Sequence, residues 1–232
     1  MGCDIGNRII MNFERTPREL VEAYDGIPSS NIGDMMNRLY CMRSYLNRIG
    51  RHDIHMHGTA FTVKVPDGDN VFLHKALDLA QPGDVIIVDG NGCTSRSLCG
   101  EIMFTYAQQR GIAGLVVDGA IRDSDALDHL ELPVYAAAIT PQGPYKNGPG
   151  EINVPVSCGG QVVFPGDLIV GDADGVCVIR RDDAEMILKL VREKFDGEQV
   201  TLENYRKGIL DREKHSATYD AILNKLNTTI RE

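Results

Sequence analysis

The sequence predicts an α/β fold built on one sheet, and three observations support this prediction. Residues 82–90 and residues 165–172 each begin with Pro-Gly-Asp and continue into an apolar run, the pattern of a turn that leads into a buried strand. A third apolar run, residues 113–117, is bounded by glycines. Segments of helical period lie between these runs, so we interpret the runs as strands of one sheet rather than as tandem domains.

Two helices are expected before the first strand. The first begins at Thr16-Pro17-Arg18-Glu19, with Thr16 as the N-cap, proline in the first turn and Glu19 three positions after the cap. The second begins at Pro28-Ser29-Ser30. Its apolar face is formed by Ile32, Met35, Met36 and Leu39.

The period changes from helical to alternating after His57. Phe61, Val63 and Val65 alternate with polar residues, which predicts a half-buried strand. A turn over residues 66–69 follows, and Asn70 is placed as the cap of a helix. His74 is expected on the flank of this helix in a structural role.

The segment from residue 91 to residue 130 contains the most distinctive pattern. Residues 91–97 are expected to form a loop of small residues, and a helix begins at Gly100. The apolar side of that helix is predicted to carry Ile102, Met103, Tyr106 and Ala107. Gly119 is expected to end the strand of residues 113–118, and residues 125–130 have a helical pattern.

The remaining chain is predicted to continue the sheet and then to become helical. We expect a strand over 133–137, an irregular loop over 140–150, a hairpin of 152–156 with 161–164 and a turn at 172–175. A helix should run from Asp182 to Phe195, with interruptions at Gly197 and Gly208, and a last helix over about 214–226. We therefore divide the chain into an N-terminal helical arm (1–27), an α/β domain (28–180) and a C-terminal helical arm (181–232).

Composition excludes several classes of protein. The six cysteines form no C-x-x-C pair, which argues against a structural zinc site or disulfide framework and indicates the reducing cytoplasm. Membrane binding is not expected, because no apolar run approaches membrane-spanning length and no secretory signal is apparent. The net charge is −9, and residues 180–232 are neutral, so the body is acidic. An acidic body without a basic patch is a poor direct partner for nucleic acid.

Arg122 and Asp123 lie where the strand of residues 113–118 gives way to a helix. Ligands in α/β proteins usually bind at the carboxyl ends of strands, so an adjacent cation and carboxylate at this point indicate a site. The alternative is a surface ion pair with Asp123 capping the following helix. Glu101 likewise has an alternative interpretation as a solvated residue on a helix face.

The blocks around these residues resemble the RraA-like family, which includes the class II 4-hydroxy-4-methyl-2-oxoglutarate/4-carboxy-4-hydroxy-2-oxoadipate aldolases. The family motif is an acidic residue, twenty intervening positions and then Arg-Asp, which Glu101 and Arg122-Asp123 match. Further blocks, at residues 58–63, 82–85, 150–156 and 165–176, extend the resemblance over about 28–179. One position departs from the family pattern, because Ala126 stands where many members carry Glu or Asp.

The resemblance implies an α-β-β-α sandwich of the swivelling β/β/α type that assembles as homotrimers or hexamers with sites at subunit junctions. Asp123 would bind a divalent metal, Mg²⁺ or Mn²⁺. Arg122 would bind the substrate together with Gly100, Glu101, Ile102 and Met103 at a helix N-terminus. A Glu from a neighbouring subunit would stand near the metal. Both Glu193 and Glu198 are candidates for this role.

The implied activity is that of a carbon–carbon lyase. Cleavage of a 4-hydroxy-2-oxo acid leaves a pyruvate enolate, whose charge a metal and the Arg122 guanidinium would stabilise. Glu101 would orient water at the metal. Oxaloacetate decarboxylation passes through the same enolate and is expected as a further activity. Absence of a lysine beside the motif favours the metal route over a Schiff base. The competing interpretation is a non-catalytic regulator that binds RNase E or a helicase.

Overall fold

The computed structural model describes residues 3–229. It contains one compact unit that ends at Arg192 and a second that begins at Glu193. The strands are β1 (Asn7–Ile9), β2 (Asn47–Ile49), β3 (Met56–Lys64), β4 (Asp84–Ser97), β5 (Gly114–Ile121), β6 (Val134–Ile139), β7 (Gly150–Ile152), β8 (Val156–Cys158), β9 (Gln161–Val163), β10 (Leu168–Gly171) and β11 (Val176–Ile179). The helices are α1 (Arg18–Glu22), α2 (Ser29–Met35), α3 (Val71–Leu79), α4 (Glu101–Gln109), α5 (Ala184–Arg206) and α6 (Arg212–Lys225), with 3₁₀ segments η1 (Ser124–His129) and η2 (Arg181–Asp183).

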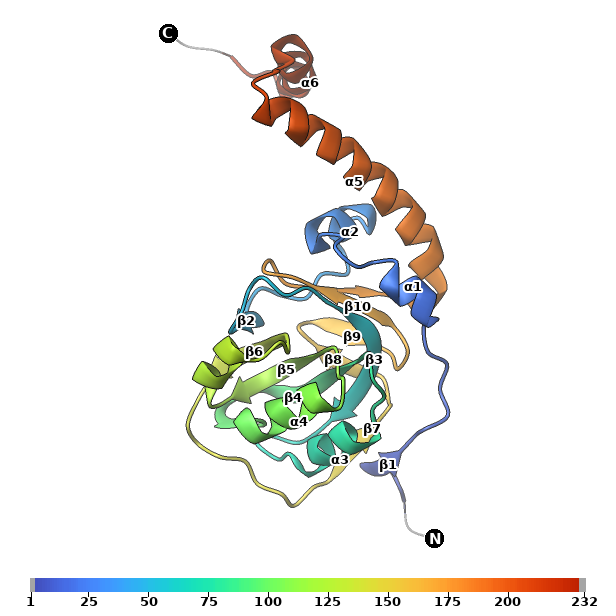
Figure 1. The fold of residues 1–232 in the computed structure, drawn as a ribbon, viewed down its shortest axis with the longest axis vertical. Coiled ribbons are helices and arrows are strands. Elements are labelled where there is room, and N and C mark those ends of the chain that lie inside the picture. The colour runs from blue at the N-terminus through green and yellow to red at the C-terminus, as the bar shows by residue number, and fades with distance from the viewer. Residues whose placement is uncertain (1–2, 230–232) are drawn as a thin grey trace. The chain divides into compact units, whose positions relative to one another are not determined.

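The first unit is built on a nine-stranded mixed sheet (Figure 1). Seven strands follow the order β1-β7-β3-β4-β5-β6-β2, while β10 pairs with β3 and β11 pairs with β10. The four central strands β3, β4, β5 and β6 are mutually parallel. Strands β8 and β9 form a separate antiparallel pair. The predicted α/β class is therefore confirmed.

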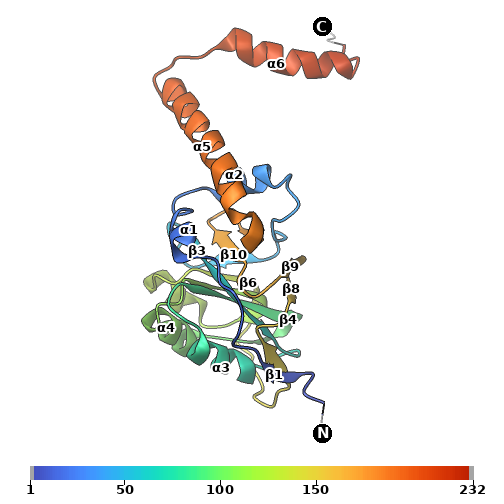
Figure 2. The same ribbon diagram turned by 90° about the vertical axis from the view of Figure 1, so that its right-hand side faces the viewer.

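Strand β4 sends side chains to both faces of the sheet, and each face is covered. Ile86 and Val88 pack in one apolar cluster together with residues of helices α3 and α4. Val85 and Ile87 pack in a second cluster that includes residues of β8, β9, β10 and β11. The two views show α3 and α4 together on one side of the sheet (Figures 1 and 2). Burial on both faces explains why these strands are continuous apolar runs.

The repeated Pro-Gly-Asp sequence forms the same turn twice. Asp84 accepts the backbone N–H of Gln81 at 2.8 Å, and Asp167 accepts that of Phe164 at 2.9 Å. Each carboxylate also pairs with an arginine, Arg15 in one case and Arg180 in the other. The preceding glycines have φ of +88° and +91°, a conformation that disfavours a side chain. The sequence repeat therefore marks a repeated structural unit, as predicted.

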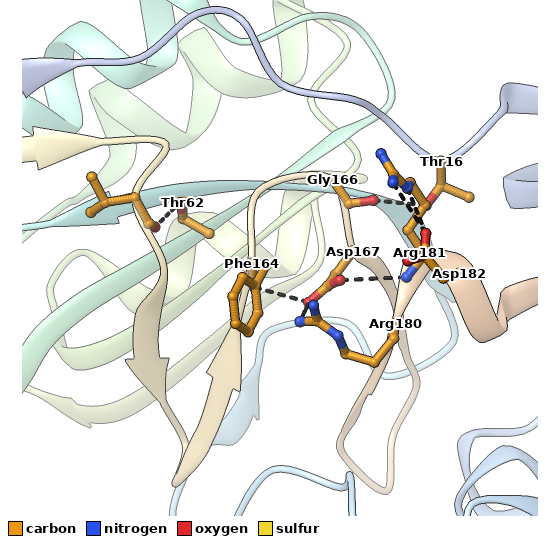
Figure 3. A network of polar contacts seen from close by, with 9 residues as sticks. Thr16, Thr62, Phe164, Gly166, Asp167, Arg180, Arg181 and Asp182 are labelled. Atoms are coloured by element: carbon orange, nitrogen blue, oxygen red, sulfur yellow. Dashed lines mark hydrogen bonds and ion pairs between the residues drawn. The ribbon is translucent and has the colours of Figure 1, made fainter.

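Thr16 does not cap the first helix, in contrast to the prediction. Its hydroxyl donates to the carbonyl of Gly166 at 2.7 Å, and Figure 3 shows this contact beside the contacts of Asp167. An added Cβ at Gly166 would lie 1.9 Å from the carbonyl oxygen of Glu14. The segment before α1 is thus held against the turn that precedes β10. Burial raises the pKa of Asp167, while its bonds to Arg180 and to backbone amides oppose this.

Two glycines predicted to interrupt elements do not do so. Strand β5 continues through Gly119 to Ile121. A Cβ added at Gly119 would meet Leu98 Cδ1 at 3.0 Å. Helix α5 continues through Gly197 to Arg206. The predicted loop of residues 91–97 is also wrong, because these residues belong to β4 and pair with β5 across two register shifts.

Two predicted helix faces need correction as well. In α4 the buried residues are Met103, Phe104 and Ala107, whereas Ile102 is 83% exposed. Tyr106, predicted on the same apolar side, is also exposed. Helix α2 ends at Met35, so Leu39 lies beyond it and is exposed.

The second unit consists of the distal part of α5 and helix α6. Nearly all of its described side chains are exposed. Within residues 3–229, no helix is both long enough and apolar enough to cross a membrane.

Candidate functional site

A cavity of about 620 Å³ lies at the carboxyl ends of the parallel strands β4, β5 and β6. Glu101 starts the helix that follows β4, Arg122 and Asp123 directly follow β5, and Thr140 follows β6. All four residues line the cavity. Because neighbouring parallel strands end at one edge of the sheet, three segments distant in sequence meet here.

Asp123 is held in an unusual backbone conformation. Its φ and ψ are 55° and 43°, in the left-handed region that few residues other than glycine, Asn and Asp adopt. Its Oδ2 accepts the backbone N–H of Glu101 at 3.1 Å and makes no capping bond to η1. Asp123 therefore caps α4, which precedes it in sequence, and the interpretation that it caps the following helix is wrong. Its Oδ1 accepts no hydrogen bond from another described residue.

Arg122 has most of its hydrogen-bonding capacity free. Its backbone N–H donates to the carbonyl of Cys99 at 3.0 Å, which fixes the chain, and its Nε lies 3.4 Å from Asp123 Oδ2. Among residues 3–229, none accepts a hydrogen bond from its guanidinium. The side chain is 43% exposed. A structural arginine would usually donate to a carboxylate through two nitrogens, so these free donors are suited to a ligand.

Gly100 leaves space for the side chains of Arg122 and Asp123. An added Cβ at Gly100 would stand 2.4 Å from Asp123 Oδ2, 2.8 Å from Arg122 Cγ and 3.0 Å from Arg122 Nε. Its φ of −158° is ordinary extended backbone, so glycine is needed here only for space. On the other side, a Cβ at Gly143 would lie 3.3 Å from Arg122 Nη1.

The first turn of α4 offers two free amides. The N–H of Glu101 is bonded to Asp123, and that of Met103 donates to the carbonyl of Gly100 at 2.9 Å. The N–H groups of Gly100 and Ile102 have no acceptor among the described residues. Free amides at a helix N-terminus bind carboxylates well. Of the four residues that the family resemblance places at the substrate, Met103 is buried and its amide is already used.

Arg122 also lines a second cavity of about 380 Å³, together with Gly100, Ile102 and Met103, which the family resemblance places at the substrate. Asn70, His74 and Lys146 line it together with Arg122 and Gly143. Asn70 is 2% exposed, its Nδ2 donates to the carbonyl of Leu98 at 2.8 Å, and within residues 3–229 nothing donates to its buried Oδ1. Burial and the nearby Lys146 lower the pKa of His74. The cationic side chains of Arg122 and Lys146 and the acceptor of Asn70 suit an organic anion that carries a hydroxyl group.

Lys146 reaches this cavity because its loop is fastened at several points. Asp69 is buried and accepts the backbone N–H groups of Asn147 and Gly148, and also that of Val71 at the start of α3. Arg96 donates to the carbonyl of Gly143 at 3.0 Å. The irregular loop predicted over 140–150 is thus present and ordered. Its Gly- and Pro-rich composition was the one signal in the sequence that set this loop apart.

The donor set at Asp123 fits a hard divalent ion. No group of three or more His, Cys, Asp or Glu side chains able to enclose a metal occurs within residues 3–229. An ion at Asp123 would have one protein carboxylate and complete its shell with water, which Mg²⁺ accepts readily. Glu101 and Asp125 also line the cavity and add negative charge around it. Glu193 and Glu198 both lie in the second unit, so their assignment to a neighbouring site remains a prediction.

Comparisons with known proteins place most of the chain in one group. The model of the RraA-like family, described as Aldolase/RraA, matches residues 29–178. A protein from Halalkalibacterium halodurans, provisionally named a 4-hydroxy-4-methyl-2-oxoglutarate aldolase, is 41% identical over 76% of this chain and 83% of its own. A protein from Bacillus cereus with the same provisional name is 33% identical over 61% of this chain and 88% of its own.

Solved structures show the same fold. RraAS2 from Streptomyces coelicolor, described as an unusual member of the RNase ES inhibitor RraA protein family, matches with a TM-score of 0.69 and 29% identity. This match covers 84% of the present chain and 99% of RraAS2. An uncharacterized Pseudomonas syringae protein matches with a TM-score of 0.73 at 22% identity, which is evidence for the fold alone.

Proposed function

The chain belongs to the RraA-like family, and from this premise we propose that it is a divalent-metal-dependent aldolase that cleaves 4-hydroxy-2-oxo acids to pyruvate. The observation that carries the proposal is the position of Arg122 between two cavities, in space left by Gly100. Asp123 lines the first cavity with Arg122, and Gly100 and Ile102, whose amides are free, line the second. The aldolase names of relatives support the same reaction class. We include 4-hydroxy-4-methyl-2-oxoglutarate as a substrate and oxaloacetate decarboxylation as a second activity.

Binding and charge stabilisation are assigned to the chain's own groups. The amides of Gly100 and Ile102 bind the carboxylate of the 2-oxo acid, since they are free and at a helix N-terminus. The guanidinium of Arg122 donates to the 2-oxo oxygen and stabilises the negative charge that develops there as the pyruvate enolate forms. Because Arg122 is always protonated, it stabilises this charge without transferring a proton. The carboxylate of Glu101 orients water in the cavity.

Asp123 would hold the metal, Mg²⁺ or Mn²⁺, which when bound supplies Lewis-acid polarisation of the 2-oxo group. The proximity of Asp123 to Arg122 then has a purpose beyond an ion pair. Substrate oxygens that approach Asp123 also approach the free donors of Arg122.

The second cavity supports a dicarboxylic substrate. Lys146 and Arg122 would bind the carboxylate of the departing half, and Asn70 Oδ1 would accept the hydrogen bond of a hydroxyl group. Arg122 lines both cavities, so a substrate whose carboxylates bind in the second cavity would present its 2-oxo group to the guanidinium and to Asp123 in the first.

The test is pyruvate release from 4-hydroxy-4-methyl-2-oxoglutarate and from oxaloacetate, coupled to lactate dehydrogenase. Asp123→Asn is the sharpest variant, because Asn retains the acceptor that caps α4 and tolerates the left-handed conformation while it loses the charge. We expect Asp123→Asn and chelation by EDTA to abolish turnover, and Mg²⁺ or Mn²⁺ to restore it in the wild type. Asp128→Ala, which removes an exposed acid of η1 outside the cavity, is the matched control. Full activity in EDTA would contradict the metal mechanism.

The alternative function is that of a non-catalytic regulator, which the similarity to RraAS2 favours. A regulator requires no turnover with either substrate. If the metal-loaded protein releases pyruvate from neither substrate and instead lowers the activity of RNase E or of a helicase, this alternative replaces the aldolase proposal.

A further inference from the structure

Two of the six cysteines lie side by side, away from the candidate active site. Cys41 follows α2, and Cys177 is the second residue of β11. We propose that Cys41 and Cys177 form a reversible intramolecular disulfide, in which the Cys41 thiol reacts first with a peroxide or with a low-molecular-weight disulfide.

The backbone already holds the two residues in register for such a bond. Cys41 and Cys177 are opposite each other in an antiparallel bridge, and their Sγ atoms are 3.5 Å apart. Hydrogen bonds from Met42 N to Val176 O and from Val178 N to Tyr40 O lie on either side of the pair. This pattern makes Cys41 and Cys177 a non-hydrogen-bonded pair, the kind in which opposing side chains approach most closely. The Cα separation typical of such pairs falls within the disulfide range.

The two thiols differ in the way that a reactive and a resolving cysteine should. Cys41 is exposed, and the hydrogen bond with Cys177 lowers its pKa to about 7, against the opposing effects of burial and Asp34. Cys177 is buried, and its pKa is raised by the same hydrogen bond and by burial. The lowered pKa favours the thiolate of Cys41, which is the form that attacks peroxides and disulfides. Cys177 remains a protected thiol until its neighbour is oxidised.

Gly33 supplies the space that the sulfur pair needs. An added Cβ at this position would lie 2.7 Å from Cys41 Sγ and 3.9 Å from Cys177 Sγ. Gly33 is inside α2, where glycine is less favourable than alanine. Close approach of the two sulfurs gives a physical reason for glycine at this point of the helix.

The oxidation balances with a named oxidant. With hydrogen peroxide, the Cys41 thiolate attacks one oxygen, the O–O bond breaks, and hydroxide leaves as Cys41 becomes a sulfenic acid. The Cys177 sulfur then attacks the sulfenic sulfur, and the hydroxyl group leaves as water with the Cys177 proton. Two electrons pass from the two thiols to the peroxide. With a small disulfide, thiolate exchange through a mixed disulfide gives the same product and releases two equivalents of the small thiol.

The bond would join the segment after α2 to the edge of the main sheet. The two cysteines are 136 positions apart, so the cross-link would restrict the unfolded chain strongly. We expect oxidation to raise the melting temperature by about 5–15 °C. Neither cysteine lines either cavity of the candidate active site, so failure of this proposal would leave the proposed aldolase function untouched.

The test is to treat the full-length protein with a few equivalents of hydrogen peroxide or oxidised glutathione, alkylate it, and digest it with trypsin. Cys41 falls in the short peptide of residues 39–43, and Cys177 in the peptide of residues 147–180, which also contains Cys158. Mass spectrometry should find these two peptides linked, with fragment ions that place the link at Cys177. Cys158 is buried and its pKa is raised, so it should carry the alkyl label after denaturation.

Matched variants make the result decisive. Cys41→Ser should lose the linked peptide and the rise in melting temperature, whereas Cys3→Ser, which removes the other exposed cysteine, should retain both. Cys177→Ala should leave Cys41 as a sulfenic acid that dimedone traps after peroxide treatment, and the acid should form more slowly because the hydrogen bond that lowers the pKa of Cys41 is lost. If Cys177→Ala is unstable, the Cys41→Ser and Cys3→Ser comparison alone decides the matter. The proposal is overturned if oxidised wild type shows no 41–177 link, or if Cys41→Ser shows the same thermal shift as wild type.

Discussion

Replacement of Gly100 by alanine is the most direct test of the site geometry. The new Cβ would stand 2.4 Å from Asp123 Oδ2, whereas ordinary contacts begin at 3.4 Å. The carboxylate must therefore move by about 1 Å, and the Arg122 side chain must move with it. A misplacement of about 1 Å costs on the order of 10²-fold in rate, equivalent to about 2.7 kcal/mol of transition-state stabilisation.

The fold should tolerate this substitution. Gly100 has an extended backbone that alanine adopts without strain, and the atoms displaced belong to two half-exposed side chains, those of Asp123 and Arg122, rather than to the backbone or the core. We expect kcat/KM for pyruvate release to fall about 100-fold, while the melting temperature changes little. Circular dichroism melts alongside the coupled lactate dehydrogenase assay would separate the two effects.

A graded series of glycine substitutions tests the reasoning. A Cβ at Gly143 would lie 3.3 Å from Arg122 Nη1, a slight overlap, so Gly143→Ala should lower activity only a few-fold. A Cβ at Gly197 would meet nothing within 4 Å, so Gly197→Ala should leave activity unchanged. If Gly100→Ala retains wild-type kcat/KM, the positions of Asp123 and Arg122 are not critical for the reaction. In that case the site assignment is wrong.

Four further predictions concern other parts of the chain. Arg122→Lys should lower kcat by about 10²–10³-fold, because an ammonium cannot replace the guanidinium fork. Glu101→Gln should lower kcat by only about 10–100-fold, because Glu101 acts through water. Steady-state kinetics would show whether Arg122→Lys is the more impaired variant. Asp69→Ala removes the acceptor of three backbone N–H groups and should lower the free energy of unfolding by about 1–3 kcal/mol in urea titrations, with a raised KM because Lys146 loses its anchored loop. Alkylation of Cys41 by iodoacetamide should rise with pH through a midpoint of about 7, below the usual thiol value of about 8.5, since its pKa is lowered; a midpoint at the usual value would contradict this. Light scattering should give the mass of a trimer or a hexamer, and a monomeric mass at micromolar concentration would refute the oligomer that the family resemblance implies.

The sequence was sufficient for the class of fold because local patterns determine it. The Pro-Gly-Asp turns are closed by contacts three residues apart, so they are visible in the sequence. The continuation of β5 through Gly119 was not visible, because glycine serves there to admit Leu98 rather than to turn the chain. The strand conformation of residues 91–97 depends in the same way on pairing with β5 across two register shifts, which no local pattern encodes.

Some residues of the candidate site could be predicted from the sequence, and others could not. Arg122 and Asp123 were found because they lie at the end of an apolar strand, and Glu101 because of its spacing to them. Asn70 and Lys146 have no such relation in sequence. They meet because Asp69 holds the loop of Lys146 against the start of α3 through backbone amides. A contact between two non-periodic segments becomes apparent only in the folded chain.

Asp123 links the formation of the site to the formation of the fold. The Oδ2 atom that caps α4 belongs to the same carboxylate that we propose as the metal ligand, and the capped helix carries the amides of Gly100 and Ile102. Docking of α4 against the end of β5 therefore places the substrate amides, the Arg122 donors and the carboxylate in one step. A surface ion pair would not need Arg122 donors left free, Asp123 Oδ1 left free and a glycine that makes room for both. These three features together are expected of a site that binds an anion and a cation at once.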